Sequence, residues 1–331
     1  MSLEKYIFMG KRFFRDLKKT KFVYPISNNL HGQILEKYYF DFDETEIREG
    51  KHQALIKSFN KNDIPLNVSY VDVETKKFHY YPITIGQYGL SVFHTYLRTK
   101  SEYDEERFLK FVEWFDNNAE ISDDLGVIWL TDIPLPQYRN SGPWQSAFAQ
   151  GRGISILLRG YQLTGEKKYV KMPEQALIPF TKPVSEGGVT SFTKWGPFYE
   201  EYTAEVPTLV LNGMIFSLCG VYDFMRVLPE NQLAKKIFYE GIQTLKNILP
   251  EYDLGYWSRY NLCRAEWYPE VDPATAGYQR LHVVQLQMLY RLTGEVVFKE
   301  YADKFRNQDS LKNILKMYRV KYSALRKLKR L

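Results

Sequence analysis

Apolar residues recur at helical spacing in several stretches of the chain. Ile154, Leu157, Leu158 and Tyr161 stand at positions i, i+3, i+4 and i+7, and a similar stripe begins at Leu211. Residues with this spacing lie on one face of an α-helix. We therefore predict that these stretches form helices with one apolar side.

A proline stands before each of four such stretches. Pro82, Pro143, Pro207 and Pro273 are roughly 60 to 66 residues apart, and Asp272 is placed to cap the last helix. Proline suits the first turn of a helix, because its missing N–H would be unpaired there anyway. Each start is followed by a second, charged helix after a recurring turn, clearest at residues 161–166 and 290–295. The pattern predicts a mainly α fold, in which four helical hairpins form an incomplete α/α toroid.

The two ends of the chain differ from this pattern. Residues 67–73 alternate between polar and apolar, and a second short run follows at 78–81, which predicts a small N-terminal β-hairpin region. Residues 309–331 read as a basic amphipathic helix. We therefore divide the chain into a basic segment with the β-hairpin region (1–80), the toroid (81–308) and the C-terminal helix (309–331).

Charge is concentrated at the C-terminus. The net charge is +6, yet residues 311–331 contain eight basic residues and no acid, so the rest of the chain is slightly acidic. A terminal helix docked on the toroid with a solvated basic face is the interpretation that we favour. Contact of this helix with a membrane surface or an anionic polymer stays open. Nucleic-acid binding has only this tail in its favour and is not predicted.

Composition adds three expectations. The chain has 26 Tyr, 21 Phe and 6 Trp, and tyrosine and tryptophan faces stack well against sugar rings, so we expect a carbohydrate-facing surface.

The two cysteines, Cys219 and Cys263, lie in apolar surroundings and are expected to be buried free thiols. Without an apolar leader or an apolar run of membrane-spanning length, a cytoplasmic protein is expected. A homodimer stays open.

The common catalytic signatures are missing from the sequence. None of the five histidines pairs at i, i+4 with another histidine or cysteine, and we find no nucleophile elbow, phosphate loop or dinucleotide fingerprint, so no metal and no cofactor is expected. The run around Gly153 is too short for a phosphate loop, and Gly153 is expected to allow close helix packing. Tyr278, His282 and Gln285 share one helical stripe, and Gln150 lies on another. A buried Gln or His is usually a satisfied core group, but three in line favour a binding site.

The order of several short stretches resembles the heparosan/heparan sulfate D-glucuronyl C5-epimerase family, in its C-terminal catalytic domain. The matching stretches lie at residues 81–91, 144–151, 200–202, 211–218, 252–255 and 278–287. The resemblance implies that the β-sandwich-like N-terminal part of that family is shortened here. It also implies an enzyme, an isomerase that converts D-glucuronate to L-iduronate within an acidic polysaccharide and needs no cofactor.

The resemblance carries over to individual residues. It implies that Tyr202, Tyr260 and Tyr278 are the catalytic tyrosines, with Glu201 as the adjacent acid. The residues expected to bind substrate are Gln87, Tyr88, Trp144, Gln150, Arg152, Asn212, Arg259, Arg264, Arg280 and His282. Two positions depart from the family pattern: Cys263 stands where the family has an arginine, and Gln279 where it has a histidine.

The residue types suit the reaction. The C5 proton of a glucuronate is α to the carboxylate, so its removal requires a base, an acid on the other face and a clamp for the developing charge. Arg259, Arg264 and Arg280 are candidates for the clamp, or ordinary surface arginines. A phenol titrates near ~10, so a basic tyrosinate needs donors or cations nearby. A uronate lyase, which shares the first step, and a non-catalytic glycan-binding toroid remain as alternatives.

Overall fold

A computed structural model of the chain describes residues 10, 13–14, 16–17, 24–49, 56–70 and 72–330. The structure is mainly helical, with small sheets. Its long helices follow one another as antiparallel pairs: α3 (Pro82–Thr99) with α4 (Glu102–Asn117), α5 (Ala147–Thr164) with α6 (Lys168–Gln175), α7 (Leu211–Val227) with α8 (Gln232–Ile248), and α9 (Ala276–Thr293) with α10 (Val296–Gln308). These pairs confirm the predicted helical hairpins.

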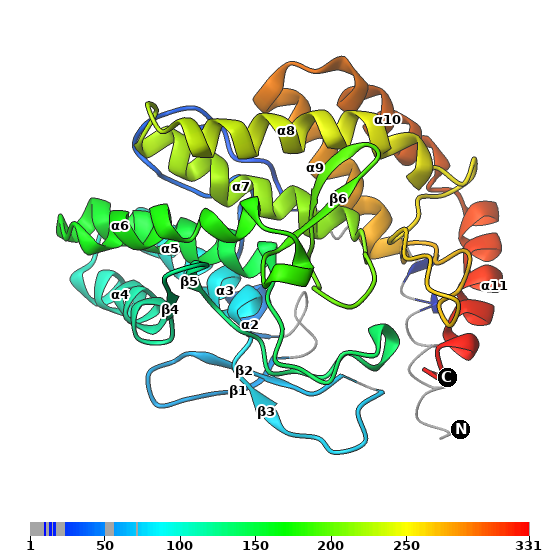
Figure 1. Cartoon of the computed structure of the whole chain (residues 1–331), viewed down its shortest axis with the longest axis horizontal. Coiled ribbons are helices and arrows are strands. Elements are labelled where there is room, and N and C mark those ends of the chain that lie inside the picture. The colour runs from blue at the N-terminus through cyan, green and yellow to red at the C-terminus, as the bar shows by residue number, and fades with distance from the viewer. Residues whose placement is uncertain are drawn as a thin grey trace.

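The first helices of the hairpins pack against one another in chain order. Helix α5 lies between α3 and α7, and α7 also contacts α9. Figure 1 shows α5, α6, α7 and α8 side by side. A Cβ atom added to Gly220 of α7 would overlap the backbone of Gly151 on α5, so this glycine pair lets the two helices approach closely. Gly153, which was expected to allow close helix packing, instead makes room for the ring of Trp129, which lies outside the helices.

The helix starts differ in detail from the prediction. Pro82 is the first residue of α3, but α5, α7 and α9 begin three or four residues after Pro143, Pro207 and Pro273. Asp272 is not a cap. Thr275 caps α9 by accepting a hydrogen bond from the backbone N–H of Tyr278, whereas Asp272 pairs with Lys321 at 2.6 Å. A side-chain oxygen one residue before the helix satisfies the free N–H groups better than a carboxylate further upstream.

Short strands fill the connections. β1 (Ile56–Phe59), β2 (Pro65–Val68) and β3 (Phe78–His79) form an antiparallel sheet, in which Val68 pairs with Phe78. The pairing of β2 with β3 confirms the predicted hairpin, although Val71, inside the predicted first strand, lies outside the described residues. Two further hairpins, β4 (Glu120–Ser122) with β5 (Gly126–Ile128) and β6 (Thr190–Thr193) with β7 (Gly196–Tyr199), were not predicted.

The N-terminal residues share the helical core. Tyr38, Phe40 and Phe42 are fully buried in the same apolar cluster as α3, α5 and α7. The hydroxyl group of Tyr39 donates a hydrogen bond to Asp223 of α7, which also pairs with Arg159 of α5 at 2.7 Å. A short helix, α2 (Glu44–Arg48), contacts α3. The predicted boundary at residue 80 therefore does not divide the core.

Helix α11 (Leu311–Lys327) lies at the outer edge of the molecule (Figure 1). Ile314 and Met317 are buried against Trp257, Ala274 and Ala276. This packing confirms that the helix is docked on the rest of the protein. Among the described helices, none combines the length and the apolar character needed to cross a membrane.

Candidate active site

The loop after β7 carries Glu200, Glu201 and Tyr202 into the interior. Glu200 anchors this loop, because its carboxylate accepts hydrogen bonds from Ser191 at 2.6 Å, from the hydroxyl group of Thr208 at 2.6 Å and from the backbone N–H of Leu209 at 2.9 Å. These donors join the β6–β7 hairpin to the segment that leads into α7. Glu200 thereby fixes the position of the two residues that follow it.

Glu201 packs against the first turn of α7. Its carboxyl group accepts a hydrogen bond from Nδ2 of Asn212 at 3.2 Å and is also hydrogen-bonded to Tyr202. Gly213 leaves the space that the Glu201 side chain occupies, since a Cβ atom there would lie well inside van der Waals contact. Burial raises the pKa of Glu201 to about 7, against the opposing effect of these two donors. The group can therefore gain and lose a proton near neutral pH.

Tyr202 is the centre of a cluster of phenols. Its hydroxyl group is within hydrogen-bonding reach of Tyr70, Tyr81 and Tyr260 as well as Glu201. Burial, followed by the neighbouring Glu201 carboxylate, raises the pKa of Tyr202 well above its ordinary value. The ring packs edge-on against Trp144, with ring centroids 5.3 Å apart. Tyr202 is thus held as a neutral phenol beside a carboxyl group that titrates near neutrality.

Tyr260 and Tyr278 stand next to each other at the start of α9. Their ring centroids are 4.9 Å apart, and both rings are half-buried. Tyr260 comes from the loop before α9, whose backbone pairs with Asp272 and with the first residue of α7. Burial first, and then the Glu201 carboxylate, raises the pKa of Tyr260 well above its ordinary value. The structure therefore brings together all four residues that were expected to be catalytic.

The expected cations lie at different places. Arg259 and Arg264 line one pocket of about 420 Å³ together with Tyr268 and Lys327. Arg280 lies apart from them in an ion pair with Asp309 at 2.7 Å. A cation that the sequence analysis did not single out, Lys321 of α11, stands 5.7 Å from the ring centroid of Tyr260.

The other expected binding residues are mostly buried. Asn212 and Trp144 touch the cluster directly, and Gln87 donates a hydrogen bond to Tyr24. Tyr88 is outside the cluster, where its hydroxyl group contacts Arg48 and Glu44.

Three more of these residues are fully buried in the core. Gln150 is fully buried, and its amide group bonds the backbone of Trp129, Val127 and Ala176. His282 is bonded to Ser258, and burial lowers its pKa to about 3. The guanidinium group of Arg152 is enclosed by the rings of Tyr38, Phe42, Phe148 and Phe216.

Sequence reasoning missed two members of the cluster. Tyr70 and Tyr81 hydrogen-bond to each other at 3.3 Å and lie next to Tyr202, although they precede it by more than a hundred residues. Tyr81 stands inside one of the stretches that carry the family resemblance, and this position could have marked it as a candidate site residue. Tyr70 ends the first arm of the N-terminal hairpin, and no helical periodicity marks it.

The arrangement suits proton transfer. Several phenols surround one carboxyl group whose pKa is near 7, and the outermost pair, Tyr260 and Tyr278, is partly exposed. Groups of this kind act as general acids and bases when they are within hydrogen-bonding reach of the proton that moves. Within the described ranges, no group of three or more His, Cys, Asp or Glu side chains is placed to hold a metal ion.

Comparison with known proteins finds similar sequences and a solved structure of similar fold. The chain is 27% identical over 270 residues to an uncharacterised protein of Methanocaldococcus jannaschii, covering 76% of this chain and 85% of the relative. It is 32% identical over 173 residues to the D-glucuronyl C5-epimerase of Caenorhabditis elegans, covering 49% of this chain but only 28% of that protein. The solved structure of cellobiose 2-epimerase from Spirochaeta thermophila is similar in fold, with a TM-score of 0.50 at 12% identity, over 69% of this chain and 58% of that one.

The family comparison covers the site itself. The model of the D-glucuronyl C5-epimerase C-terminus matches residues 125–307, a range that contains Glu201, Tyr202, Tyr260 and Tyr278. This range is more than half of the chain, and the chain therefore belongs to the D-glucuronyl C5-epimerase C-terminal family.

Proposed function

We propose that this protein epimerises D-glucuronate residues at C5 to L-iduronate within an acidic polysaccharide. The observation that carries the proposal is the contact of one carboxyl group, Glu201, whose pKa is about 7, with a phenol cluster that includes Tyr202 and Tyr260. Family membership and the likeness to a D-glucuronyl C5-epimerase support it. The four hairpins are proposed to form an incomplete α/α toroid, with this site at the end where the linkers meet.

Tyr260 and Tyr278 are the proposed proton-transfer pair. One phenolate oxygen takes the C5 proton, and the electrons of the broken C–H bond pass into the carboxylate of the uronate. The other phenol then gives a proton to C5 from the opposite face, so no further reactant is consumed. General acid and base groups of this kind contribute about 10²–10⁴-fold to a rate.

Glu201 is the proposed proton store of this reaction. The neutral phenols of the resting site must lose a proton before one of them can act as a base, because burial holds their pKa values high. Burial raises the pKa of Glu200 to about 7 as well, but its carboxyl group is taken up by hydrogen bonds within its own loop and from Ser191. Glu201 is bonded to Tyr202 and is therefore the proposed acceptor of that proton. Tyr202 joins it to Tyr260. A tyrosinate then forms without a charge leaving the buried cluster.

Arg259 and Arg264 are proposed to hold the anionic polymer beside the cluster. Both line the pocket of about 420 Å³, and Arg259 directly precedes Tyr260 in the chain. Glu251, Glu266 and Glu270 line the same pocket, and Arg264 lies 3.7 Å from Glu251, so the polymer would replace this carboxylate on Arg264. Guanidinium groups bind carboxylates through two parallel hydrogen bonds, which fixes the orientation of the uronate. A glucuronate polymer of the heparosan type, with or without sulfate groups, is the proposed substrate class.

Incubation of glucuronate polymers with the protein in deuterated water tests this proposal. We expect deuterium at C5 and iduronate signals by NMR, with no unsaturated uronate absorbing in the ultraviolet. Appearance of the unsaturated product with chain shortening would assign the protein as a lyase. Binding of the polymer with neither change would make it a glycan-binding protein.

A further inference from the structure

The outward face of α11 combines exposed apolar and basic side chains. Leu311, Leu315 and Tyr322 are 57%, 50% and 40% exposed, and their spacing of i, i+4 and i+11 places them on one line. A helix buries such a line when its apolar side is fully docked on the protein. Here the docking side is the one that holds Ile314 and Met317, so this second apolar line is left at the surface.

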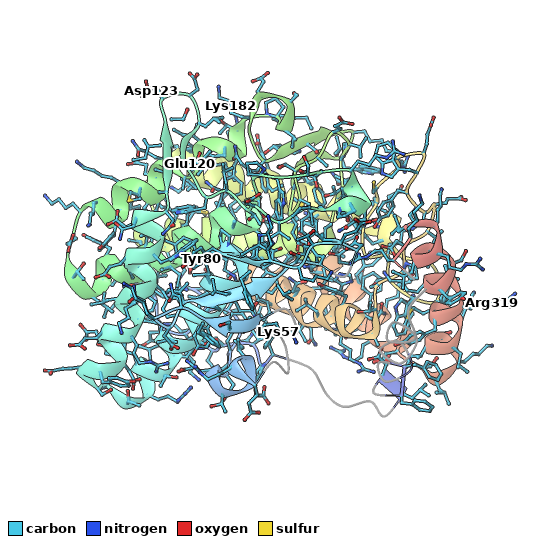
Figure 2. The ribbon with its side chains drawn as sticks, turned by 90° about the horizontal axis from the view of Figure 1, so that it is seen from below. Lys57, Tyr80, Glu120, Asp123, Lys182 and Arg319 are labelled. Carbon is cyan, nitrogen blue, oxygen red and sulfur yellow. The ribbon has the colours of Figure 1, made fainter. Side chains whose placement is uncertain are left out.

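A row of cations runs beside this line. Lys312, Lys316, Arg319 and Arg326 are exposed, and no acidic residue occurs from position 310 to the end of the chain. In the described part of the chain, Lys312, Arg319 and Arg326 form no ion pair. Figure 2 shows Arg319 projecting from α11 away from the rest of the molecule. The row therefore faces outward and carries uncompensated positive charge.

The helix cannot turn its inner side outward. Lys321 pairs with Asp272, and Lys327 donates hydrogen bonds to the backbone carbonyl groups of Glu266 and Tyr268. Arg330, after the helix, lies 3.4 Å from Asp72. These contacts, with the buried Ile314 and Met317, hold α11 in one orientation, and the outer face is formed before any partner arrives.

A second segment extends the apolar line. Phe14 is 65% exposed, and its neighbour Phe13 packs edge-on against Tyr318 of α11, with ring centroids 5.0 Å apart. Exposed apolar side chains thus come from α11 and from a second segment that packs against it. Cations can hold an anionic polymer and aromatic rings can stack on its sugars, but leucine side chains do neither, so the exposed leucines point to a partner with an apolar interior.

We propose that the outer face of α11 binds the surface of a bilayer that contains anionic lipids. Leu311, Leu315, Tyr322 and Phe14 enter the boundary between headgroups and acyl chains, and the basic row contacts the negatively charged headgroups. A surface helix with an apolar edge and a basic row has the character of helices that lie in this interface. The slightly acidic remainder of the chain turns away from the membrane, so the protein takes one orientation on it.

Sedimentation of the full chain with vesicles tests the proposal, and polysaccharide chemistry plays no part in this assay. We expect binding to vesicles of phosphatidylcholine with one quarter phosphatidylglycerol at 0.1 M salt, little binding to pure phosphatidylcholine, and weakening at 0.5 M salt. The double variant Lys312→Gln/Arg319→Gln should lower partitioning roughly 20- to 30-fold. The double variant Leu311→Ser/Leu315→Ser should lower it about tenfold.

Two comparisons distinguish a bilayer from an anionic polymer. Lys57 and Lys236 are exposed lysines outside α11, and Lys57→Gln/Lys236→Gln should bind vesicles like the unchanged protein. The leucine variant should keep its retention on an immobilised glucuronate polymer, since serine removes no charge. The proposal is overturned if the chain does not bind the anionic vesicles, if it binds neutral vesicles equally, or if the leucine variant, folded by circular dichroism, binds the vesicles unchanged.

Discussion

Nδ2 of Asn212, in the first turn of α7, lies 3.2 Å from Oε2 of Glu201. This hydrogen bond joins the first helix of the third hairpin to the loop that carries Tyr202. The backbone carbonyl oxygen of Asn212 also accepts a hydrogen bond from Nε2 of Gln285 of α9, at 2.9 Å. One residue therefore ties the acid of the cluster to the two helices that border the site.

Glu201→Gln should change both the pH dependence of activity and that of stability. The ionised carboxylate is needed to accept a phenol proton, so activity of the unchanged protein should rise with pH through about 7. In the glutamine variant this rise of activity with pH should disappear, and the rate should fall about 10²–10⁴-fold. Glu205→Gln, at an exposed position in the same loop, is the matched control and should leave the profile unchanged.

The effect on stability has the opposite sign. The pKa of Glu201 is higher in the folded protein than in the unfolded chain, so its stabilising contribution is present at low pH and is lost as pH rises from about 4.5 to about 7. At pH 8, Glu201→Gln should therefore be more stable than the unchanged protein, by up to roughly 3 kcal/mol. Urea unfolding at pH 5 and pH 8 measures this, and a glutamine variant that is less stable at pH 8 would contradict the burial argument.

Tyr278→Phe should lose about 10²–10⁴-fold in epimerisation rate while keeping its fold. The substitution removes only the hydroxyl group from a half-buried ring that packs against Tyr260. Tyr290→Phe is the control, because Tyr290 is a half-buried tyrosine near the other end of the same helix. Turnover assayed alongside circular dichroism tests this, and near-normal turnover of Tyr278→Phe would remove it from the proposed pair.

Gly213→Ala should impair activity through the position of Glu201. The added Cβ atom would meet the Cβ and carboxyl atoms of Glu201, which must then move away from Asn212 and Tyr202. Gly277→Ala is the control on α9, where the nearest atom to an added Cβ is Thr275 Oγ1 at 3.9 Å. This second variant should be about 0.5–1 kcal/mol more stable than the unchanged chain in thermal unfolding, since alanine favours a helix. If Gly213→Ala keeps full activity, the carboxyl group does not need its present position.

Arg152 and Arg159 of α5 should respond in opposite ways to methionine. The guanidinium group of Arg152 has no hydrogen-bond partner in the described part of the chain and sits among aromatic rings, so Arg152→Met should be nearly neutral for stability. Arg159→Met removes the closer of the two arginine partners of the buried Asp223, leaving Arg226 at 3.6 Å, and should cost up to about 3–5 kcal/mol. Equal losses from both variants in urea unfolding would show that the charge of Arg152 is itself stabilising.

The repeat made the hairpins predictable, but not the helix starts. Apolar spacing and the turns that end in Gly165 and Gly294 mark where helices run and stop, because both glycines adopt the left-handed conformation that ends α5 and α9. The starts depend on single cap residues such as Ser146 and Thr275, which stand three residues after Pro143 and two after Pro273. Proline spacing alone could not identify these caps.

The candidate site was predictable as far as the resemblance extended. Glu201, Tyr202 and Tyr278 lie in stretches that carry it, Tyr260 follows one of them by five residues, and the structure brings the four together. Tyr70 joins them through a three-dimensional contact that no local pattern encodes. Gln150 and His282 were the reverse case: Gln150 bonds backbone groups and His282 bonds the hydroxyl group of Ser258. A polar residue on an apolar helical face looks the same in sequence whether it faces a ligand or bonds its neighbours in the core.

Solvent exchange at C5 directly tests whether Tyr260 and Tyr278 move the C5 proton. The unchanged protein and the double variant Tyr260→Phe/Tyr278→Phe are incubated with a glucuronate polymer in deuterated water, and deuterium at C5 is followed by NMR. We expect C5 deuterium in both glucuronate and iduronate for the unchanged protein, and exchange at least 100-fold slower for the folded double variant. Exchange at an undiminished rate in the double variant would contradict it, because the proton would then move through groups other than these two tyrosines.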